Sequence, residues 1–372
     1  MRNIDLSNQR VLVTGATGFL GSRLVEKLII DHNARVRVII RNFNKAARIA
    51  RFGIEIIKGD VTDPDNVDSA VKDCDIVIHC AWSYSDKHNE KETKQSNIEG
   101  LKNILRAAER EKVKRTIFVS SQAVYPDREK GYITEDSARR YTGNVYPDTK
   151  LRCEEIVRSF SEKGVPVVTV QPTTIYGPWS TIWTVNPLMR LKKMYLALDD
   201  GEGLCNAVYV DDVVEALVLA SVKEKAVGET FLISGEEPAR WKDFYGAYEK
   251  MLGVNSLVYK DPKTLKAHIR WQKFFESGVG KLLFPIRQVL REYPLMVKGY
   301  LLFKTSVGQV EIKKEDPRKP TRMPNEVIFK ILQAKAIVKI DKAKRLLDYQ
   351  PAFDFERGMA MTETWAKWAN LL

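Results

Sequence analysis

The sequence predicts an α/β fold, a doubly wound parallel sheet followed by a smaller mixed α/β part. Short runs rich in Val and Ile alternate with helical patterns over residues 1–180, as βαβ units do. A glycine-rich segment, 14–21, joins the first of these runs directly to a helical pattern. Beyond Pro178 the alternation becomes irregular, which indicates a second kind of structure.

The expected elements follow in order. The strands are nearly continuous in apolar residues, as strands buried on both faces are. They comprise Arg10–Thr14, Arg35–Ile40, Glu55–Lys58, Ile76–Cys80, Thr116–Ser120, Val167–Gln171 and Thr230–Ile233. The expected helices are Ser22–Ile30, Asn44–Phe52, Val67–Val71, Gln95–Glu111, Thr149–Lys163, Asp211–Val222, Arg240–Leu252, Asp341–Leu347 and Phe355–Asn370. Right-handed crossovers then place a ligand crevice at the carboxyl ends of the strands.

The glycine-rich segment has the spacing of a turn that binds a dinucleotide. Gly15, Gly18 and Gly21 recur every three residues between the first strand and the first helix. Such glycines permit a tight turn, let backbone amides approach a pyrophosphate, and let the helix pack closely on the sheet. The helix N-terminus adds free amides and the positive end of its dipole.

The chain is long enough for two domains, since 372 residues can form one large α/β core and a smaller one. We expect residues 1–180, with parts of 205–235, to form the dinucleotide-binding domain. The rest, 181–372 and mainly 181–204 and 236–372, is expected to bind the substrate. A composition of 44% hydrophobic and 29% charged residues is that of a globular protein.

The positive charge is concentrated in one segment. The net charge is +12, and residues 261–322 contain 14 Lys and Arg against 6 Asp and Glu, so this segment contributes +8. It lies in a basic, aromatic-rich insertion at about 255–325. Such a patch attracts polyphosphates, nucleic acids or anionic membranes, or simply solubilises one face. We expect no nucleic acid partner. The segment 261–310 either forms a solubilising face or makes peripheral contact with a membrane.

Other residue types exclude several classes. Residues 1–10 are polar and no apolar stretch approaches about 20 residues, so we expect a cytoplasmic protein without a signal peptide. The four cysteines are scattered, as reduced thiols are. The four histidines show no metal-ligand spacing, so no metal site is expected.

A tyrosine and a lysine four residues apart form the second strong motif. Tyr146 and Lys150 share one helical face, where an ammonium group favours phenolate and lowers the tyrosine pKa from about 10. Pro147 is tolerated only in the first helical turn, so Tyr146 is expected at the mouth of the helix. Ser120 and Ser121 end a strand, which brings a hydroxyl to the edge of the sheet where ligands bind.

With these motifs in order, the chain resembles the extended short-chain dehydrogenase/reductase family (the NAD-dependent epimerase/dehydratase group), over about 8–250 and 335–370. The matching motifs are TGATGFLG at 14–21, GDVTD at 59–63, HCAW at 79–82, NIEGLKNIL at 97–105, VSSQAVYP at 119–126, YPDTK at 146–150, QPTTIYGP at 171–178, NAVYVDDVVEA at 206–216 and FLISGEE at 231–237. The resemblance implies a Rossmann-like fold and hydride transfer to or from a nicotinamide. It also implies a homodimer through the helices at 95–111 and 149–163.

The resemblance implies a role for each matched residue. Ser121 polarises the reacting oxygen, Tyr146 moves the proton, and Lys150 binds the nicotinamide ribose and tunes Tyr146. The expected cofactor-binding residues are Gly15, Thr17, Gly18, Phe19, Leu20, Gly21, Arg41, Asp60, Val61, Cys80, Ala81, Tyr146, Lys150, Gln171 and Pro172. The substrate is expected at Tyr84, Gln122, Asn186 and Asn206, although Asn186 is also a natural helix cap before Pro187.

The end of the second strand bears on the choice of cofactor. An acidic residue there accepts the ribose 2′-OH of NAD, whereas an arginine suits the 2′-phosphate of NADP. The sequence has Arg41 and Asn42, with Lys45 nearby and no acid. We therefore expect NADP(H), with NAD(H) as the alternative.

Two functions stay open. Family dehydratases carry an acidic pair where this chain has Gln122 and Ala123, so 4,6-dehydration is disfavoured. The expected function is an NAD(P)-dependent oxidoreductase or epimerase acting on a hydroxyl or keto group, foremost of a nucleotide-activated sugar. The alternative is an NADPH-dependent reductase or dehydrogenase of an apolar sterol-, polyketide- or lipid-like alcohol or ketone. The presence of Ser121, Tyr146 and Lys150 argues against a cofactor-binding protein without turnover.

Overall fold

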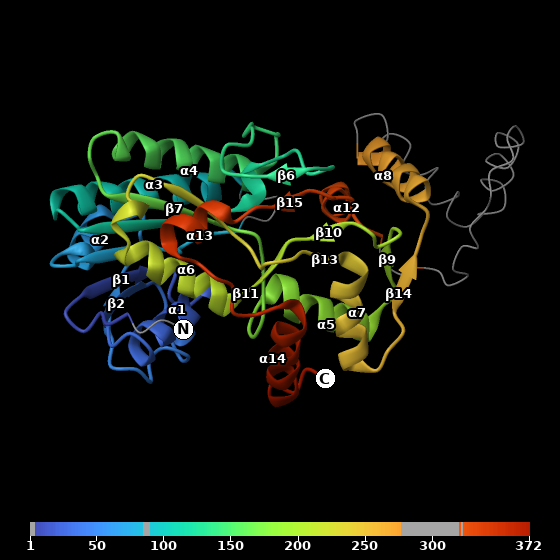
Figure 1. Ribbon diagram of the computed structural model, residues 1–372, viewed down its shortest axis with the longest axis horizontal. Helices are drawn as coiled ribbons and strands as arrows, with labels where there is room; N and C mark the ends of the chain where they lie inside the picture. The colour runs from blue at the N-terminus through green and yellow to red at the C-terminus, as the bar shows by residue number, and fades with distance from the viewer. Residues whose placement is uncertain (1–3, 85–89, 277–319, 321–322) are drawn as a thin grey trace, which may run out of the picture. The chain divides into compact units, whose positions relative to one another are not determined.

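The computed structural model describes residues 4–84, 90–276, 320 and 323–372, and the chain divides into two compact units (Figure 1). The first unit comprises Met1–Pro187, Leu204–Ala239 and Lys335–Leu372. The second comprises Leu188–Gly203 and Arg240–Ala334. Most of the predicted basic insertion, and of the segment 261–310 proposed to contact membranes, lies outside the described residues.

The first unit is built on a seven-stranded sheet whose neighbouring strands are all parallel. Its strands are β1 (Arg10–Thr14), β2 (Arg35–Ile40), β3 (Glu55–Lys58), β4 (Ile76–His79), β5 (Arg115–Val119), β7 (Val167–Pro172) and β12 (Thr230–Ile233). They lie in the order β12-β7-β5-β4-β1-β2-β3. The strand order reverses between β1 and β4, so the predicted doubly wound sheet is confirmed, with its switch point beside the glycine turn.

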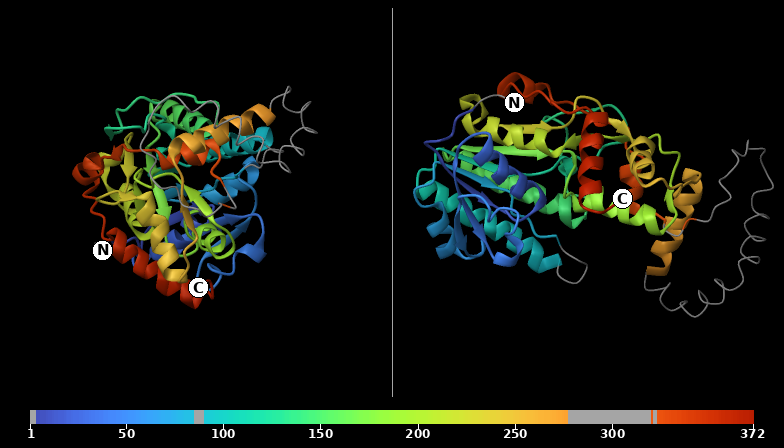
Figure 2. Two further views of the ribbon diagram at one scale, coloured as in Figure 1. Left: turned by 90° about the vertical axis from the view of Figure 1, so that its right-hand side faces the viewer. Right: turned by 90° about the horizontal axis from the view of Figure 1, so that it is seen from below.

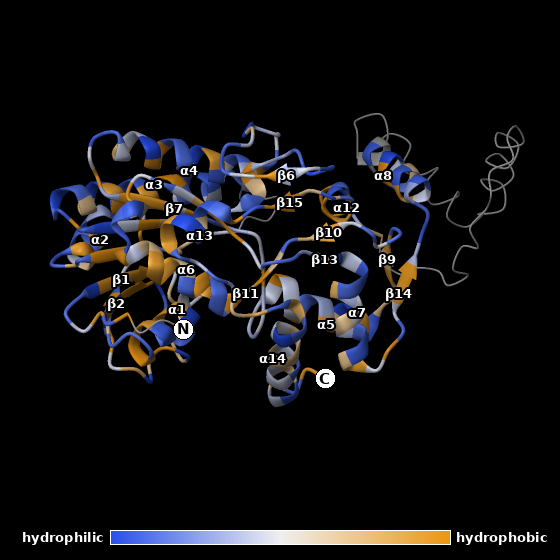
Figure 3. Ribbon diagram, viewed as in Figure 1, coloured by the Kyte–Doolittle hydropathy of each residue, from blue (hydrophilic) through white to orange (hydrophobic). Residues whose placement is uncertain are grey.

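Helices cover both faces of this sheet (Figures 1 and 2). One face carries α2 (Pro64–Val71), α3 (Glu90–Arg110) and α4 (Val145–Ser161), and the other carries α1 (Phe19–Ile30), α6 (Val210–Val222) and α13 (Asp341–Leu347). Alternate residues of β1 enter separate apolar clusters, Val11 and Val13 in one and Leu12 in the other. This double burial explains the continuous apolar runs of the strands, which Figure 3 shows in the hydrophobic colours.

Smaller elements complete the fold. Short parallel pairs join β6 (Tyr132–Ile133) to β15 (Ile337–Val338) and β8 (Thr174–Tyr176) to β11 (Ala207–Tyr209), and β10 (Leu204–Cys205) lies beside β13 (Ala239–Arg240). The last helix is α14 (Phe355–Trp368). Single turns occur at Phe43–Lys45, Gln122–Val124, Thr181–Val185 and Glu224–Ala226.

The second unit has a small core of its own. Its strands are β9 (Leu196–Leu198) and β14 (Leu257–Tyr259), and its helices are α7 (Trp241–Leu252), α8 (Pro262–Glu276), α12 (Glu326–Leu332) and most of α5 (Asn186–Lys193). Leu265, Ile269 and Phe329 pack together in this core. The Trp241 indole is buried and donates a hydrogen bond to the Ile331 carbonyl oxygen at 2.9 Å.

The structure differs from the predicted domain division in its last residues. The sequence analysis assigns 335–372 to the substrate part, whereas the structure places them in the first unit. The reason is that β15 pairs with β6, and that α13 packs against α6 and β12. These partners lie far away in the sequence, so no local sequence pattern predicts the contacts.

The predicted helix Asn44–Phe52 is wrong. The backbone instead makes successive three-residue turns, in which the amides of Ala46, Ile49 and Phe52 donate to the carbonyls of residues 43, 46 and 49. Ala46 and Ile49 belong to the apolar core. A three-residue spacing of apolar side chains suits such turns as well as it suits one face of a helix.

Within the described part of the chain, no helix combines the length and the apolar character that a membrane crossing requires.

Candidate active site

The glycine turn fills a space that admits no side chain. Gly15 has φ +67°, in the left-handed region, and a Cβ atom on it would lie 2.6 Å from the Ala81 amide nitrogen. A Cβ atom on Gly21 would collide with the Gly15 carbonyl oxygen. The end of β4, the turn and α1 therefore pack together as closely as backbones allow.

The N-terminus of α1 is open to an anion. Gly18 caps the helix without a side-chain hydrogen bond, and the first turn contains no acidic residue. Thr17 lies in the turn, and Phe19 and Leu20 begin the helix. Free amides at a helix start attract phosphate. The residues present therefore fit the pyrophosphate of a dinucleotide.

A buried threonine and histidine lock β1 to β4 at this turn. The Thr14 hydroxyl shares a 2.8 Å hydrogen bond with His79 Nδ1 and accepts the Ala81 amide at 3.2 Å. These contacts hold Cys80 and Ala81 beside Gly15. Burial lowers the pKa of His79 to about 3, with a smaller contribution from the Lys150 charge, so the ring is neutral.

The neutral His79 predicts sensitivity to acid. A folded-state pKa below the ordinary 6.5 gives stability that is complete above pH 6.5 and is lost as the pH falls towards 3. Between pH 7.5 and pH 5, His79 alone should lower the free energy of unfolding by about 2 kcal/mol. Urea unfolding of the wild type and of His79→Asn at both pH values measures this. The same pH dependence in both proteins would contradict the assignment.

Three predicted residues lie together beyond the ends of β2 and β3. Arg41 is exposed and lies 3.6 Å from the Asp60 carboxylate. Asp60 also accepts hydrogen bonds from the amide and hydroxyl of Thr62, both at 2.9 Å. The Val61 carbonyl oxygen accepts Asn103 Nδ2 at 3.1 Å. A cation therefore lies where the sequence predicts the 2′-phosphate end of the cofactor.

One face of α3 holds two loops at the carboxyl ends of the strands, the loop with Ser83 and the loop with Val61. Asn97, Gly100 and Asn103 recur every three residues and so lie on one side of the helix. The Asn97 amide accepts the Ser83 amide at 2.9 Å and donates to the Ser83 carbonyl at 3.0 Å. Gly100 leaves room for Val61, whose Cγ2 atom would lie 2.8 Å from an added Cβ. This face explains the spacing of the NIEGLKNIL motif.

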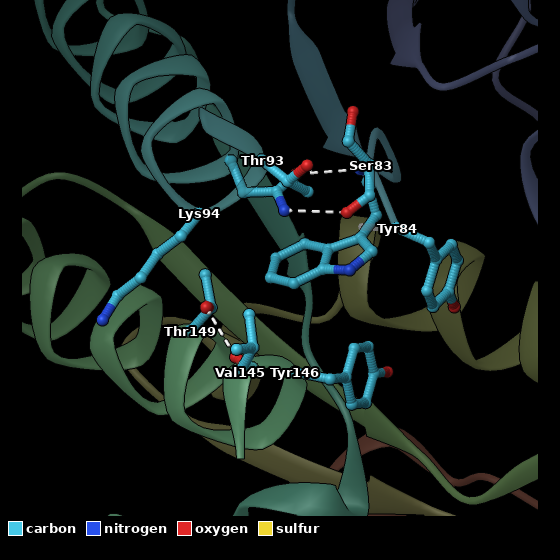
Figure 4. Close-up of a pocket in the computed structure, with 9 residues that line it drawn as sticks. Ser83, Tyr84, Thr93, Lys94, Val145, Tyr146 and Thr149 are labelled. Carbon is cyan, nitrogen blue, oxygen red and sulfur yellow. Dashed lines mark hydrogen bonds between the residues drawn. The ribbon is translucent and has the colours of Figure 1, made fainter. Parts of the chain in front are cut away.

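The structure brings Ser121, Tyr146 and Tyr84 together. Tyr146 lies in the first turn of α4, and the Tyr84 ring stacks on it at 5.8 Å between centroids and 13° between planes (Figure 4). Burial raises the pKa of Tyr146, and hydrogen bonds with the Ser121 and Tyr84 hydroxyls offset part of this effect. The Ser121 hydroxyl also accepts the Ala123 amide at 3.1 Å.

Lys150 differs from its predicted arrangement. Its ammonium donates to the Val119 carbonyl oxygen at 2.7 Å and lies 3.6 Å from the centroid of the Trp82 ring. Burial lowers the pKa of Lys150 to about 8. The sequence analysis expects Lys150 to lower the pKa of Tyr146, yet that pKa is raised. Because the ammonium is directed at a carbonyl and an indole, it does not offset the burial of the phenol.

A buried polar network lies behind these residues. Glu154 on α4 accepts the Ser120 hydroxyl, Gln171 Nε2 at 2.7 Å and Arg139 Nη1 at 3.0 Å. The Gln171 amide oxygen accepts the Tyr125 hydroxyl at 2.9 Å. Because both ends of this amide have protein partners, Gln171 ties α4 to β7, and its contact with the cofactor stays a prediction. Its neighbour Pro172 is the last residue of β7.

Three further residues are predicted to bind the substrate, and they lie in different segments of the chain. The Asn206 amide donates to the Ala336 carbonyl and accepts the Val338 amide, both at 2.9 Å, so it anchors β15. Asn186 is the first residue of α5. Gln122 is half-buried and directly follows Ser121.

A small cavity of about 70 Å³ opens beside Tyr146 (Figure 4). It is lined by Trp82, Ser83, Tyr84, Thr93, Lys94, Asn97, Val145, Tyr146 and Thr149. Trp82 meets Tyr146 edge to face at 5.8 Å. The Thr149 hydroxyl is occupied, since it donates to the Val145 carbonyl at 2.6 Å.

Sequence reasoning missed Arg128. Its guanidinium donates from Nε to the Tyr125 carbonyl at 2.9 Å and from Nη2 to the Gln122 carbonyl at 3.0 Å. The only signal in the sequence is a basic residue three positions after Tyr125.

The comparison with protein families identifies the chain. Residues 11–234, more than half of the sequence, match the model of the NAD dependent epimerase/dehydratase family. The chain belongs to this family. The predicted resemblance is therefore confirmed, and with it an oxidoreductase-type enzyme that uses a pyridine nucleotide.

Two curated relatives are similar in sequence. A 4-hydroxy-2-methyl-3-oxo-4-farnesyl-3,4-dihydroquinoline-1-oxide ketoreductase of Stigmatella aurantiaca is 25% identical over 68% of this chain and 76% of its own. A decarboxylating sterol-4-alpha-carboxylate 3-dehydrogenase of Candida albicans is 26% identical over 96% of this chain and 98% of its own.

Solved structures share the fold. An epimerase of Methanothermobacter thermautotrophicus aligns with a TM-score of 0.72 at 20% identity, covering 99% of this chain and 95% of that one. A UDP-glucose 4-epimerase of Thermotoga maritima gives 0.70 at 20% identity, covering 97% and 99%.

Proposed function

We propose that the protein is an NADP(H)-dependent reductase or dehydrogenase of a keto or hydroxyl group on an apolar, ring-bearing molecule. The aromatic wall at Tyr146 carries the proposal, because Trp82 and Tyr84 both lie against the phenol. Flat rings offer apolar contact to the ring system of a substrate. Asn97 and Thr149 in the same cavity already bond backbone groups, so these two side chains offer little to sugar hydroxyls.

The curated relatives support the same choice. One is named for the ketone of a farnesylated quinoline and the other for position 3 of a sterol carboxylate. The sequence analysis favours a nucleotide-activated sugar first. The solved structures named for such sugars are at most 21% identical, a level that supports only a common fold. The apolar alternative therefore has the stronger support.

In this proposal, a distinct task falls to each of Ser121, Tyr146 and Lys150. The bound nicotinamide supplies or accepts the hydride. Tyr146 donates its hydroxyl proton to the keto oxygen during reduction, and Ser121 donates a hydrogen bond to the same oxygen. The raised pKa keeps the phenol protonated near neutral pH, as a proton donor requires. Lys150, whose ammonium is held by the Val119 carbonyl and the Trp82 ring, would bind the nicotinamide ribose, as the resemblance implies.

The preference for NADP(H) depends on Arg41 in this proposal. Arg41→Ala should weaken NADPH binding about 10-fold and change NADH binding less than about 2-fold, since only NADPH has a phosphate for the guanidinium to bind. Calorimetric titration of both nucleotides measures the effect. Arg51→Ala is the matched control, because Arg51 is similarly exposed and pairs with Glu26. An equal loss of affinity for NADPH and NADH would show that Arg41 does not bind the 2′-phosphate.

A substrate panel tests the proposed function itself. The purified protein is incubated with both NADPH and NADP+ and with either a fused-ring ketone, such as a decalone or a steroid 3-ketone, or UDP-glucose. We expect consumption of NADPH with ring ketones and no reaction with UDP-glucose. Conversion of UDP-glucose to its epimer, with the ring ketones inert, would replace the proposal by the nucleotide-sugar alternative.

A further inference from the structure

We propose that Arg128 binds a carboxylate of the substrate, a few bonds away from the carbon whose oxygen meets Tyr146. The inference rests on the proposed function and names its substrate class, the apolar hydroxy and oxo acids.

The position of the guanidinium is fixed by the backbone that carries Ser121. Arg128 donates to the carbonyl oxygens of Gln122, the residue after Ser121, and of Tyr125. The charge of Arg128 also lowers the pKa of Tyr146, after burial and the two hydroxyl hydrogen bonds. Both observations place the cation beside the serine and the tyrosine that are proposed to contact the reacting oxygen.

This cation has no carboxylate partner among the described residues. Of the two acids adjacent in sequence, Asp127 forms an ion pair with Arg140, and Glu129 is exposed and forms no ion pair with Arg128. Glu135 accepts the Leu232 amide at 2.9 Å, and Glu154 pairs with Arg139. Burial lowers the pKa of Arg128 to about 10, as expected for a desolvated cation without a counter-ion. A half-buried charge without a counter-ion is unfavourable, so the site gains stability when an anion enters.

The shape of the Arg128 guanidinium favours a carboxylate as its ligand. The two carbonyls engage Nε and one hydrogen of Nη2, and the described residues give Nη1 no partner. A guanidinium edge presents parallel donors that match the two oxygens of a carboxylate. An acid bound there is held with its neighbouring hydroxyl or keto carbon near Tyr146.

The test compares an acid with its ester. The probes are cis-2-hydroxycyclohexanecarboxylate and its methyl ester, oxidised with NADP+. In the wild type we expect kcat/KM to favour the acid by about 30-fold, the size of a charge-assisted pair. Arg128→Met should reduce this preference at least 10-fold, and Arg128→Lys should reduce it partly. Arg140→Met, which removes the exposed arginine that pairs with Asp127, should leave the preference unchanged.

The outcomes separate this inference from the proposed function. If the ester is oxidised as well as the acid, or if a folded Arg128 variant keeps the preference, the role of Arg128 is overturned and the dehydrogenase proposal stands. If neither probe reacts, the dehydrogenase proposal fails for this class. Calorimetry of the NADP+-loaded protein with cyclohexanecarboxylate and its amide then decides. Tighter binding of the acid, lost in Arg128→Met and reduced in Arg128→Lys, supports the carboxylate site, and equal binding refutes it. Should the Met variant not fold, the Lys variant decides both assays.

Discussion

Tyr146→Phe is expected to lower kcat about 1,000-fold while nucleotide affinity stays within about 2-fold of the wild type. Removing the hydroxyl deletes the proposed proton donor but keeps the ring that packs against Trp82 and Tyr84. Positioned acid–base groups contribute roughly 100- to 10,000-fold to enzymatic rates. Steady-state kinetics on the substrate found in the panel, together with NADPH titration, measures both quantities.

Tyr141→Phe is the matched control for this substitution. The Tyr141 hydroxyl donates to Glu155 at 2.8 Å in an exposed position, so its loss should leave kcat unchanged. A Tyr146→Phe protein that keeps more than a tenth of the wild-type rate would show that another group moves the proton.

Gly15→Ala is expected to weaken nucleotide binding at least about 100-fold and to lower the free energy of unfolding by about 1–3 kcal/mol. The backbone at φ +67° disfavours any side chain, which accounts for the loss of stability. The added Cβ would also lie 2.6 Å from the Ala81 amide nitrogen and 2.7 Å from the Cys80 carbonyl carbon, so the turn must move away from β4. Urea unfolding and calorimetric titration with NADPH measure the two effects.

Gly53→Ala controls for the loss of a glycine in the same unit. No atom lies within 4 Å of a Cβ atom added there, and the residue has no positive φ. Its affinity and stability should match the wild type. Normal NADPH affinity in Gly15→Ala would place the nucleotide away from this turn.

The strands were predictable because burial on both faces leaves a strong local signal. The bounds of β2 and β12 agree with the prediction residue for residue. The segment 44–52 failed because its apolar spacing fits either a helix or successive turns, and the core contacts of Ile49 decide between them.

The site was predictable where a motif determines its own geometry. The glycine turn, the serine after β5 and the tyrosine in the first turn of α4 each follow from local sequence. The hydrogen-bond partners of Asn206 and Gln171 could not be predicted, because no local pattern indicates them and Ala336 lies 130 residues from Asn206. Arg128 was not predicted as a site residue for the same reason, since only the folded loop shows which charges surround it.

Isotope tracing tests the central claim most directly. The protein is mixed with NADP+ and with NADPH deuterated at the transferable hydrogen, and with either a fused-ring ketone or UDP-glucose, and the products are separated by chromatography and examined by mass spectrometry. The account predicts deuterium on the carbinol carbon of the reduced ring ketone, with one NADP+ formed per alcohol. Epimerised UDP-glucose without net oxidation of NADPH, and an unreacted ketone, would contradict it.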